Sequence, residues 1–201
     1  LEGGPGPDPI PDIVMDGVKS RDLFATIVPK SERVPTVWYF AAEWFYKYKN
    51  FDEARRRFEM IATQHPTTVE AENSAKLIIE SYRLVGNWGA GEEWARKLLA
   101  MQVSRGGGRK DLGKDLQVFY LGAKFKGGEE LEKQGRFDDA AKKYLSLVAE
   151  DPKNEFAPTA LFRVARNYEK LAKYESATKV YERVVNEYPK SESVDFSLHR
   201  I

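Results

Sequence analysis

The residues best suited to chemistry lie in the stretch SRGGGRKDLGKD at 104–115. Gly108, Gly113 and Lys114 have the spacing of a phosphate-binding P-loop, in which backbone N–H groups and a lysine hold phosphate oxygens. Asp115 stands where that motif places a Ser or Thr for Mg²⁺, and an amphipathic helix precedes the stretch instead of a buried strand. The stretch therefore predicts a flexible loop between helices, or a basic contact made by Arg105, Arg109, Lys110 and Lys114.

The other titratable residues form no catalytic or metal-binding pattern. His65 and His199 are the only histidines, they lie far apart in the sequence, and the chain has no cysteine. Zinc sites draw on Cys and His at short spacings, so a transition-metal site is not expected. The adjacent carboxylates at 92–93 and 129–130 point about 100° apart on a helix and cannot act as a pair. We predict no catalytic residues, no metal and no cofactor.

The composition excludes two further classes of function. Charged residues make up 31% of the chain, yet the net charge is only +1, whereas a nucleic-acid-binding protein normally carries a basic excess. No run of about 18 apolar residues is present, so no membrane-spanning helix is predicted. The absence of cysteine suits the periplasm and the cytosol equally well.

The elements that must position any site are clearest between Pro158 and Glu192. Apolar residues recur there at spacings of three and four in two runs joined by a polar link: Leu161, Ala165 and Tyr168, then Ala177, Tyr181 and Val184. Pro189 follows the second run and ends it. The pattern predicts two antiparallel helices that cannot bury their apolar faces alone.

This helical hairpin recurs along the chain. A step of 37 residues back from Tyr174, Ala177, Tyr181 and Pro189 reaches Phe137, Ala140, Tyr144 and Pro152. A further step of 86 reaches Phe51, Ala54, Phe58 and Pro66, with a degraded copy between them, and the loop at 104–115 accounts for the excess over two periods. We predict four helix pairs and the start of a fifth.

These residues resemble the tetratricopeptide repeat family, and the likeness extends over about 35–201. The motif residues are Trp38, Ala42, Phe45, Ala54, Phe58 and Pro66 in the first pair, and Gly128, Leu131, Ala140, Tyr144 and Pro152 in the third, with the residues given above in the last. Lys124, Gly91 and Ala95 depart from the pattern. The resemblance implies an all-α fold, a right-handed α-solenoid of stacked antiparallel helix pairs. The 37-residue period is more similar to bacterial envelope proteins of the BamD and YbgF (CpoB) type.

The chain is expected to divide into three parts, two of which precede the repeat array. Residues 1–15 read as an extended Pro- and Gly-rich segment that includes part of a tag or of a cut leader, and 16–34 as a cap or partial repeat. A helix is predicted from Asp16 to Val28, with Leu23, Phe24 and Ile27 covering the end of the array that occupies 35–201. The chain ends at Ile201 inside what should be the next helix, so we expect a fragment.

The stretch TVWYFAAEWFYKYK at 36–49 holds more aromatic residues than one buried face can absorb. Phe40, Trp44 and Tyr48 are expected to pack on the N-terminal segment or to cap the array, with a sticky groove for a partner peptide as the alternative. The consecutive Arg55, Arg56 and Arg57 spread around the helix, so we predict a solvated face and no basic patch.

The resemblance also implies where a partner binds, because the first helix of each pair lines the concave surface of such arrays. Carried over to this sequence, the partner-binding residues are Tyr39, Glu43, Tyr46, Lys47, Lys76, Glu80, Arg83, Phe125, Glu129, Glu132, Phe162, Arg166, Glu169 and Lys170. Aromatic anchors among alternating charges suit an extended peptide or a partner helix.

The sequence therefore favours a non-enzymatic scaffold for protein–protein interaction in a multiprotein assembly. The narrower resemblance places that assembly in the bacterial envelope, in outer-membrane assembly, division, secretion or motility, with a cytoplasmic location as the alternative. Two other functions remain open: a regulatory or targeting region of a larger enzyme, and a module that associates with its own copies through the array ends.

Overall fold

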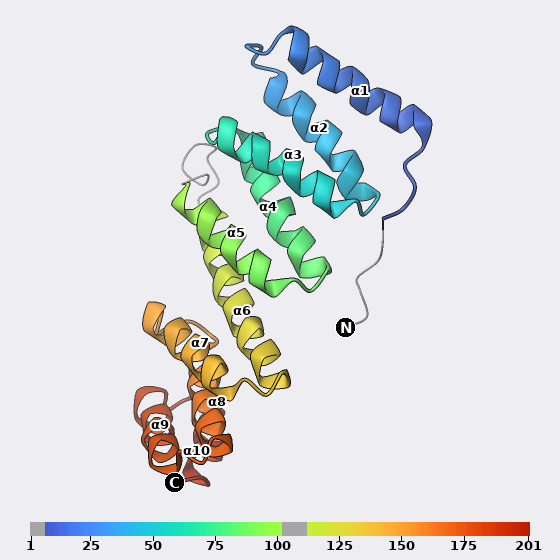
Figure 1. Cartoon of the computed structure of the whole chain (residues 1–201). Helices are drawn as coiled ribbons and strands as arrows, with labels where there is room; N and C mark the ends of the chain where they lie inside the picture. The colour runs from blue at the N-terminus through green and yellow to red at the C-terminus, as the bar shows by residue number, and fades with distance from the viewer. Residues whose placement is uncertain (1–6, 102–111) are drawn as a thin grey trace. The chain divides into compact units, whose positions relative to one another are not determined.

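The computed structural model describes residues 7–101 and 112–201, and every regular element in these residues is a helix (Figure 1). The all-α fold of stacked helix pairs predicted from the sequence is confirmed. The helices are α1 Asp12–Ile27, α2 Val34–Lys47, α3 Phe51–Gln64, α4 Val69–Leu84, α5 Trp88–Ala100, α6 Leu112–Lys133, α7 Phe137–Glu150, α8 Ala157–Lys170, α9 Tyr174–Glu187 and α10 Ser193–Leu198.

The helices form two compact units, and the division falls inside α6. The first unit runs to Tyr120, and in it α1 packs on α2, α2 on α3, α3 on α4 and α4 on α5. The second unit runs from Leu121 to Ile201, and in it α7 packs on α8, α8 on α9 and α9 on α10. We call α2, α4, α6, α8 and α10 the first helices, and α1, α3, α5, α7 and α9 the second helices.

The same turn joins the two helices of every pair. Its central residue has a positive φ angle: 56° at Lys49, 67° at Gly86, 73° at Gly135 and 56° at Ala172. The next backbone N–H bonds back to the carbonyl five residues earlier, as in Asn50 N to Phe45 O at 2.8 Å, with matching bonds in the other three turns. This is the Schellman arrangement that ends helices at a left-handed residue. The turns repeat every 37 residues within each unit.

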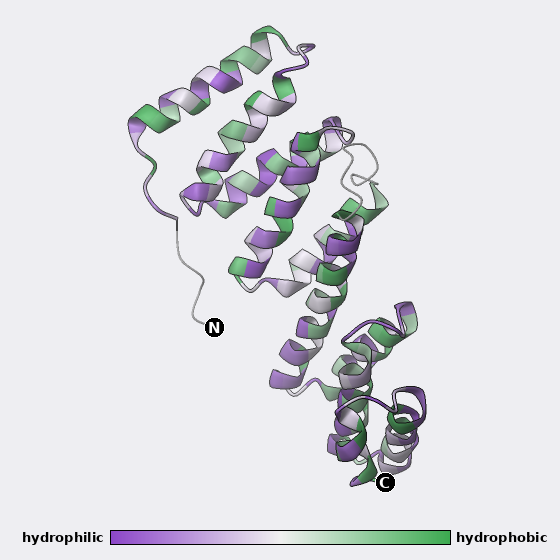
Figure 2. Ribbon diagram, turned by 180° about the vertical axis from the view of Figure 1, so that it is seen from behind, coloured by the Kyte–Doolittle hydropathy of each residue, from purple (hydrophilic) through white to green (hydrophobic). Residues whose placement is uncertain are grey.

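Hydrophobic and hydrophilic residues are mixed along the helices of both units (Figure 2), and many of the apolar ones are buried. Phe58 and Ile61 of α3 are fully buried in the first unit against Ala71, Ala75 and Ile78 of α4. The second unit likewise buries both large rings and small residues, with Tyr144, Ala165 and Tyr181 at 0% exposure. Burial of Ala165 and Tyr181 agrees with the predicted repeat register.

Gly128 marks a close approach of α6 to α7. A Cβ atom at this position would lie 2.5 Å from Cε1 and 2.6 Å from Cζ of the Tyr144 ring, which is closer than real carbon contacts. Only glycine leaves room for the ring. The prediction that two helices touch at Gly128 is therefore confirmed, and the contact explains why a poor helix former occupies the interior of α6.

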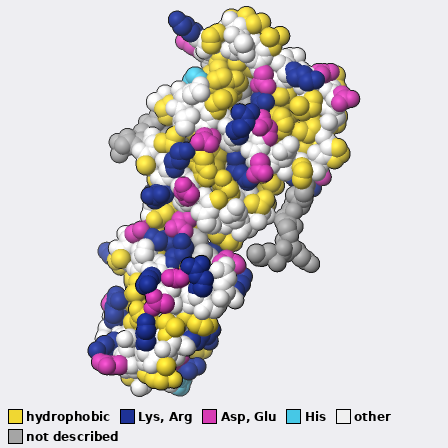
Figure 3. Space-filling view, viewed as in Figure 1, with side chains coloured by type: hydrophobic (Ala, Val, Ile, Leu, Met, Phe, Trp, Pro, Cys, Tyr) yellow, Lys and Arg dark blue, Asp and Glu magenta, His cyan; other side chains and the backbone are white. Residues whose placement is uncertain are grey.

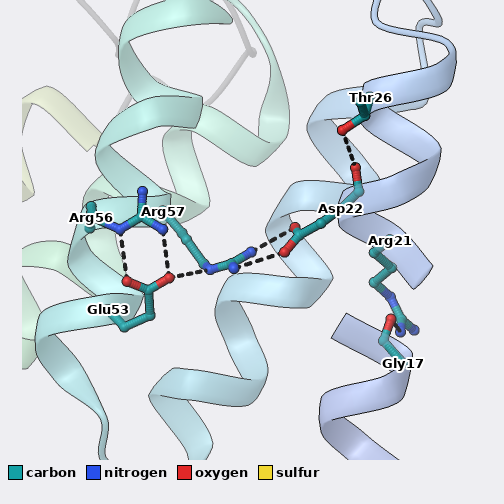
Figure 4. Close-up of polar contacts among 7 residues, drawn as sticks. All are labelled: Gly17, Arg21, Asp22, Thr26, Glu53, Arg56 and Arg57. Carbon is teal, nitrogen blue, oxygen red and sulfur yellow. Dashed lines mark hydrogen bonds and ion pairs between the residues drawn. The ribbon is translucent and has the colours of Figure 1, made fainter. Parts of the chain in front are cut away.

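The solvated arginine face predicted at Arg55–Arg57 is wrong for two of its three residues. The Arg57 side chain is 12% exposed, and its guanidinium donates to both carboxylate oxygens of Asp22 on α1 at 2.8 and 2.9 Å and to Glu53 at 2.7 Å (Figure 4). Arg55 is equally buried, donates to Ser81 Oγ at 3.1 Å and lies 4.4 Å from the Tyr82 ring centroid. Only Arg56, at 61%, matches the prediction. The long side chains of Arg55 and Arg57 reach neighbouring helices, which spacing on one helix cannot reveal.

Helix α1 differs from the prediction in its start and in its buried face. It begins at Asp12, four residues before the predicted start. Pro11 precedes the first turn, and its carbonyl oxygen accepts hydrogen bonds from the backbone N–H groups of Val14 and Met15. Val18 and Ala25 face α2 and are buried, whereas Leu23 and Ile27 are 59% and 68% exposed. The last two residues therefore do not cover the end of the array. Asp8, just before the helix, donates its N–H to Tyr48 O at 2.8 Å, as expected for a segment packed on the aromatic stretch.

The packing of Lys124 explains why a lysine can replace the large apolar residue that is usual at this position. Its side chain is only 6% exposed, and its ammonium group pairs with Glu150 at the end of α7. The aliphatic stem fills the place of the usual apolar residue while the charge reaches a carboxylate at the surface.

Candidate functional site

The partner-binding residues predicted on the first helices lie on one surface within each unit, which we call the first-helix face. In the first unit it combines α2 and α4, which lie side by side. Tyr39, Glu43 and Tyr46 of α2 and Lys76 and Glu80 of α4 are half-buried, whereas Lys47 and Arg83 are exposed. Figure 3 shows basic, acidic and apolar side chains interspersed over the visible surface of the chain. No large field of one sign forms there.

Tyr39 and Tyr46 have their rings in the core and their hydroxyl groups among carboxylates. The Tyr39 ring lies 5.7 Å from that of Phe58, and the Tyr46 ring lies 5.3 Å from that of Phe51. Burial, followed by the charge of Glu43, raises the pKa of Tyr39 to about 12. Burial and the charge of Glu80 also raise the pKa of Tyr46, against the opposing effect of Arg83. Both rings are thus held by the core while part of each stays exposed.

In the second unit a hydrogen-bonded network covers the face between α6 and α8. The Arg163 guanidinium donates to Glu129 Oε1 at 2.8 Å and also to Glu132 Oε2. Asn167 donates to the other oxygen of Glu132 at 2.9 Å. Glu129 and Glu132 are about one-fifth exposed, so their charges are largely satisfied inside the chain. Glu129 and Glu132, which were predicted to contact a partner, therefore bind α8 to α6.

The two predicted phenylalanine anchors differ in exposure. Phe125 is only 8% exposed and packs between Tyr144 and Phe156, with ring centroids at 5.3 and 5.5 Å, so it offers almost no surface. Phe162 is half-buried, with one side on Tyr181 at 5.6 Å and another facing Phe196 of α10 at 6.1 Å. Of these two phenylalanines, only Phe162 leaves ring surface on which a partner could anchor.

A hollow of about 490 Å³ opens beside Phe162 on the first-helix face of the second unit. It is lined by Phe162 and Arg166 of α8 and by Phe196, His199 and Arg200 at the end of α10. Arg166 is exposed, Arg200 lies 3.6 Å from Glu169, and the Lys170 ammonium lies 4.4 Å from the Phe137 ring. The lining holds two guanidinium groups, two phenyl rings and one imidazole ring, and no carboxylate.

Sequence analysis missed four residues of this face: Arg163, Asn167, His199 and Arg200. The period could have found two of them, because His199 and Arg200 lie 37 residues after Phe162 and Arg163, just as Glu169 lies 37 after Glu132. The network of Arg163 and Asn167 needed the structure, because no local pattern shows which carboxylate a side chain reaches.

Within the described ranges the structure shows no group of three or more potential ligands that could hold a metal ion. None of the helices in those ranges is long and apolar enough to cross a membrane. Residues 104–111 of the glycine-rich stretch lie outside the described residues, and Gly113, Lys114 and Asp115 belong to the first turn of α6. The Lys114 and Asp115 side chains are exposed, and Asp115 lies 3.7 Å from Lys76.

Comparison with known proteins bears on the helix pair formed by α8 and α9. Residues 159–191 match the family described as Tetratricopeptide repeat, which supports the resemblance for this pair. No curated protein matches the chain.

Two of the solved structures that match this chain are MamA and YrrB. MamA is 12% identical, with 86% of this chain and 87% of that one covered and a TM-score of 0.41. YrrB, described as a TPR protein with an unusual peptide-binding site, is 13% identical, with 94% and 84% covered and a TM-score of 0.39. Likeness at this level says nothing about function, and the narrower resemblance to BamD and YbgF stays a prediction.

Proposed function

We propose that this chain is a non-enzymatic scaffold that binds a peptide or helix of a partner protein on its first-helix face. The observation that carries the proposal is the repetition on that face. Equivalent positions 37 residues apart present partly exposed rings and charges: Tyr39 and Lys76, Glu43 and Glu80, and Tyr46 and Arg83. Their rings are held by the core, so little side-chain entropy is lost when a partner binds.

The repeat match at 159–191 supports the same reading, because tetratricopeptide repeats serve as protein-interaction modules. We further propose that the partner belongs to a multiprotein assembly of a bacterial envelope. The 37-residue period motivates this location. Fractionation of the source cell tests it, and recovery of the protein only with cytosolic markers would contradict it.

A crosslinked pull-down from the source cell tests the binding face. The chain is compared with a variant that reverses three charges on the first helices, Lys47→Glu, Arg83→Glu and Lys170→Glu. A matched control reverses three exposed charges on second helices: Arg56→Glu, Lys142→Glu and Lys179→Glu. All three proteins should show equal helix content by circular dichroism. We expect the partner to be lost only from the first variant, and equal capture by both variants would reject the first-helix face.

Self-association is a second candidate function, favoured by exposed apolar side chains on α1 and α10. Ile13, Leu23 and Ile27 of α1 and Phe196 and Leu198 of α10 are all more than half exposed. Light scattering over a concentration series tests this candidate, and a constant monomer mass would remove it.

A further inference from the structure

The hollow beside Phe162, between α8 and α10, lacks a carboxylate that is present at the equivalent place between α6 and α8. Between α6 and α8, Arg163 is held by two acidic residues, Glu129 and Glu132. Arg200 lies 37 residues after Arg163 and takes its place between α8 and α10. Glu169 is the residue equivalent to Glu132, and its carboxylate lies 3.6 Å from the Arg200 guanidinium. The position of Glu129 is occupied by Arg166, a second guanidinium.

The position of Glu129 is acidic on α2, α4 and α6 and basic on α8. The equivalent residues are Glu43 on α2, Glu80 on α4 and Glu129 on α6, spaced by the same repeat steps that relate the turns at Lys49, Gly86 and Gly135. On α8 the series ends in Arg166. No ion pair or hydrogen bond in the described part of the chain involves this arginine, and its side chain is exposed.

The hollow therefore combines two unlike surfaces. Arg166 and Arg200 supply donors to which one carboxylate can bind with charge-assisted hydrogen bonds. Phe162 and the 63%-exposed Phe196 supply an apolar wall next to them. Glu169, which already lies by Arg200, offsets only one of the two guanidinium charges. An anionic group is favoured here on electrostatic grounds, and a basic one is disfavoured.

We infer that this hollow binds an acidic side chain of the partner, an Asp or Glu next to an apolar residue in an extended segment. The partner's carboxylate lies between Arg166 and Arg200 and supplies the negative charge that Glu129 supplies beside Arg163. The neighbouring apolar side chain packs on Phe162 and Phe196. This inference rests on the proposed function and specifies the chemistry of the partner at one end of the same face.

The test is an NMR titration of the isotope-labelled chain with three blocked peptides, because the method detects weak binding. The peptides GSEFSG, GSQFSG and GSEASG differ only in the carboxylate or in the ring. We expect GSEFSG to shift signals of α8 and α10, and each of the other two to bind at least about fivefold more weakly. Equal binding of GSEFSG and GSQFSG would overturn the inference.

The substitution Arg166→Glu is the sharpest variant, because it installs the residue that α2, α4 and α6 carry at this position. It should leave the fold intact, place a carboxylate of the chain beside Arg200, and weaken GSEFSG binding at least about tenfold. Lys190→Glu makes the same charge change at an exposed loop position of the same unit and should leave binding unchanged. Unchanged binding by Arg166→Glu would overturn the inference.

The pull-down separates this inference from the proposed function, because its variants leave Arg166, Arg200 and both rings untouched. A partner lost from the first-helix variant together with no preference for GSEFSG would retain the scaffold and reject the acidic segment. A clear preference for GSEFSG with partner capture unaffected by the first-helix variant would retain the hollow and reject the wider face.

Discussion

Replacement of Gly128 by alanine tests the helix contact on which the second unit depends. Alanine is a better helix former than glycine, so helix propensity alone predicts a gain of about 1 kcal/mol in the free energy of unfolding. The new Cβ atom, however, would lie 2.5 Å from the Tyr144 ring, and that ring is fully buried. Inserting a methyl group into a packed core costs about 1–3 kcal/mol, and a ring with no free space places the cost at the upper end.

We therefore expect Gly128→Ala to lower the free energy of unfolding by about 2 kcal/mol after the gain in propensity is included. Gly122→Ala on the same helix is the matched control, because its Cβ atom would lie 3.5 Å from Phe156, an ordinary contact. This control should gain up to about 1 kcal/mol.

Chemical denaturation followed by circular dichroism measures both values against the unmodified chain. Opposite signs for the two variants would support the close approach of α6 and α7. Equal stabilisation by both would refute the reasoning, because it would mean that Tyr144 does not occupy the space over Gly128.

Three further predictions follow from the same packing. Tyr181→Ala should lower the free energy of unfolding by about 3–5 kcal/mol, because the ring is fully buried. Tyr174→Ala, at a 67%-exposed position, should change it by less than about 0.5 kcal/mol. If denaturation curves show that both changes are small, the predicted repeat register is wrong. In the turns, Gly135→Ala should cost about 1 kcal/mol and Ala172→Gly should gain about 0.5 kcal/mol, because both residues have positive φ; opposite signs in the same assay would contradict the turn geometry. Burial raises the pKa of Tyr181 to about 12 from the ordinary value of 10.0, so its contribution to stability is complete below pH 10 and is lost as the pH rises toward 12. Tyr181→Phe should therefore flatten the alkaline loss in a pH series of denaturation curves, and an unchanged slope would argue against a buried hydroxyl.

The sequence predicted the helix pairs because their determinants are local. Apolar spacing of three and four residues, prolines after the second helices and the 37-residue period all depend on neighbours along the chain. The turn residues obey the same local rule, since the Schellman bonds at Lys49, Gly86, Gly135 and Ala172 involve only the preceding helix. The large residues at the repeated position, Phe58, Tyr144 and Tyr181, are fully buried for the same reason.

The partners of the long charged side chains could only be found in the tertiary structure. Arg57 reaches Asp22, 35 residues away, and Arg163 reaches Glu129 and Glu132 on the neighbouring first helix. The burial of Phe125 depends likewise on Phe156 and Tyr144, which come from a loop and another helix. Helical periodicity fixes which face a residue occupies, but the length of its side chain and the neighbouring helices decide what it touches. For that reason the sequence by itself determined the repeat register and the face that carries the candidate site, and only the packing of the helices decided which residues of that face remain open to a partner.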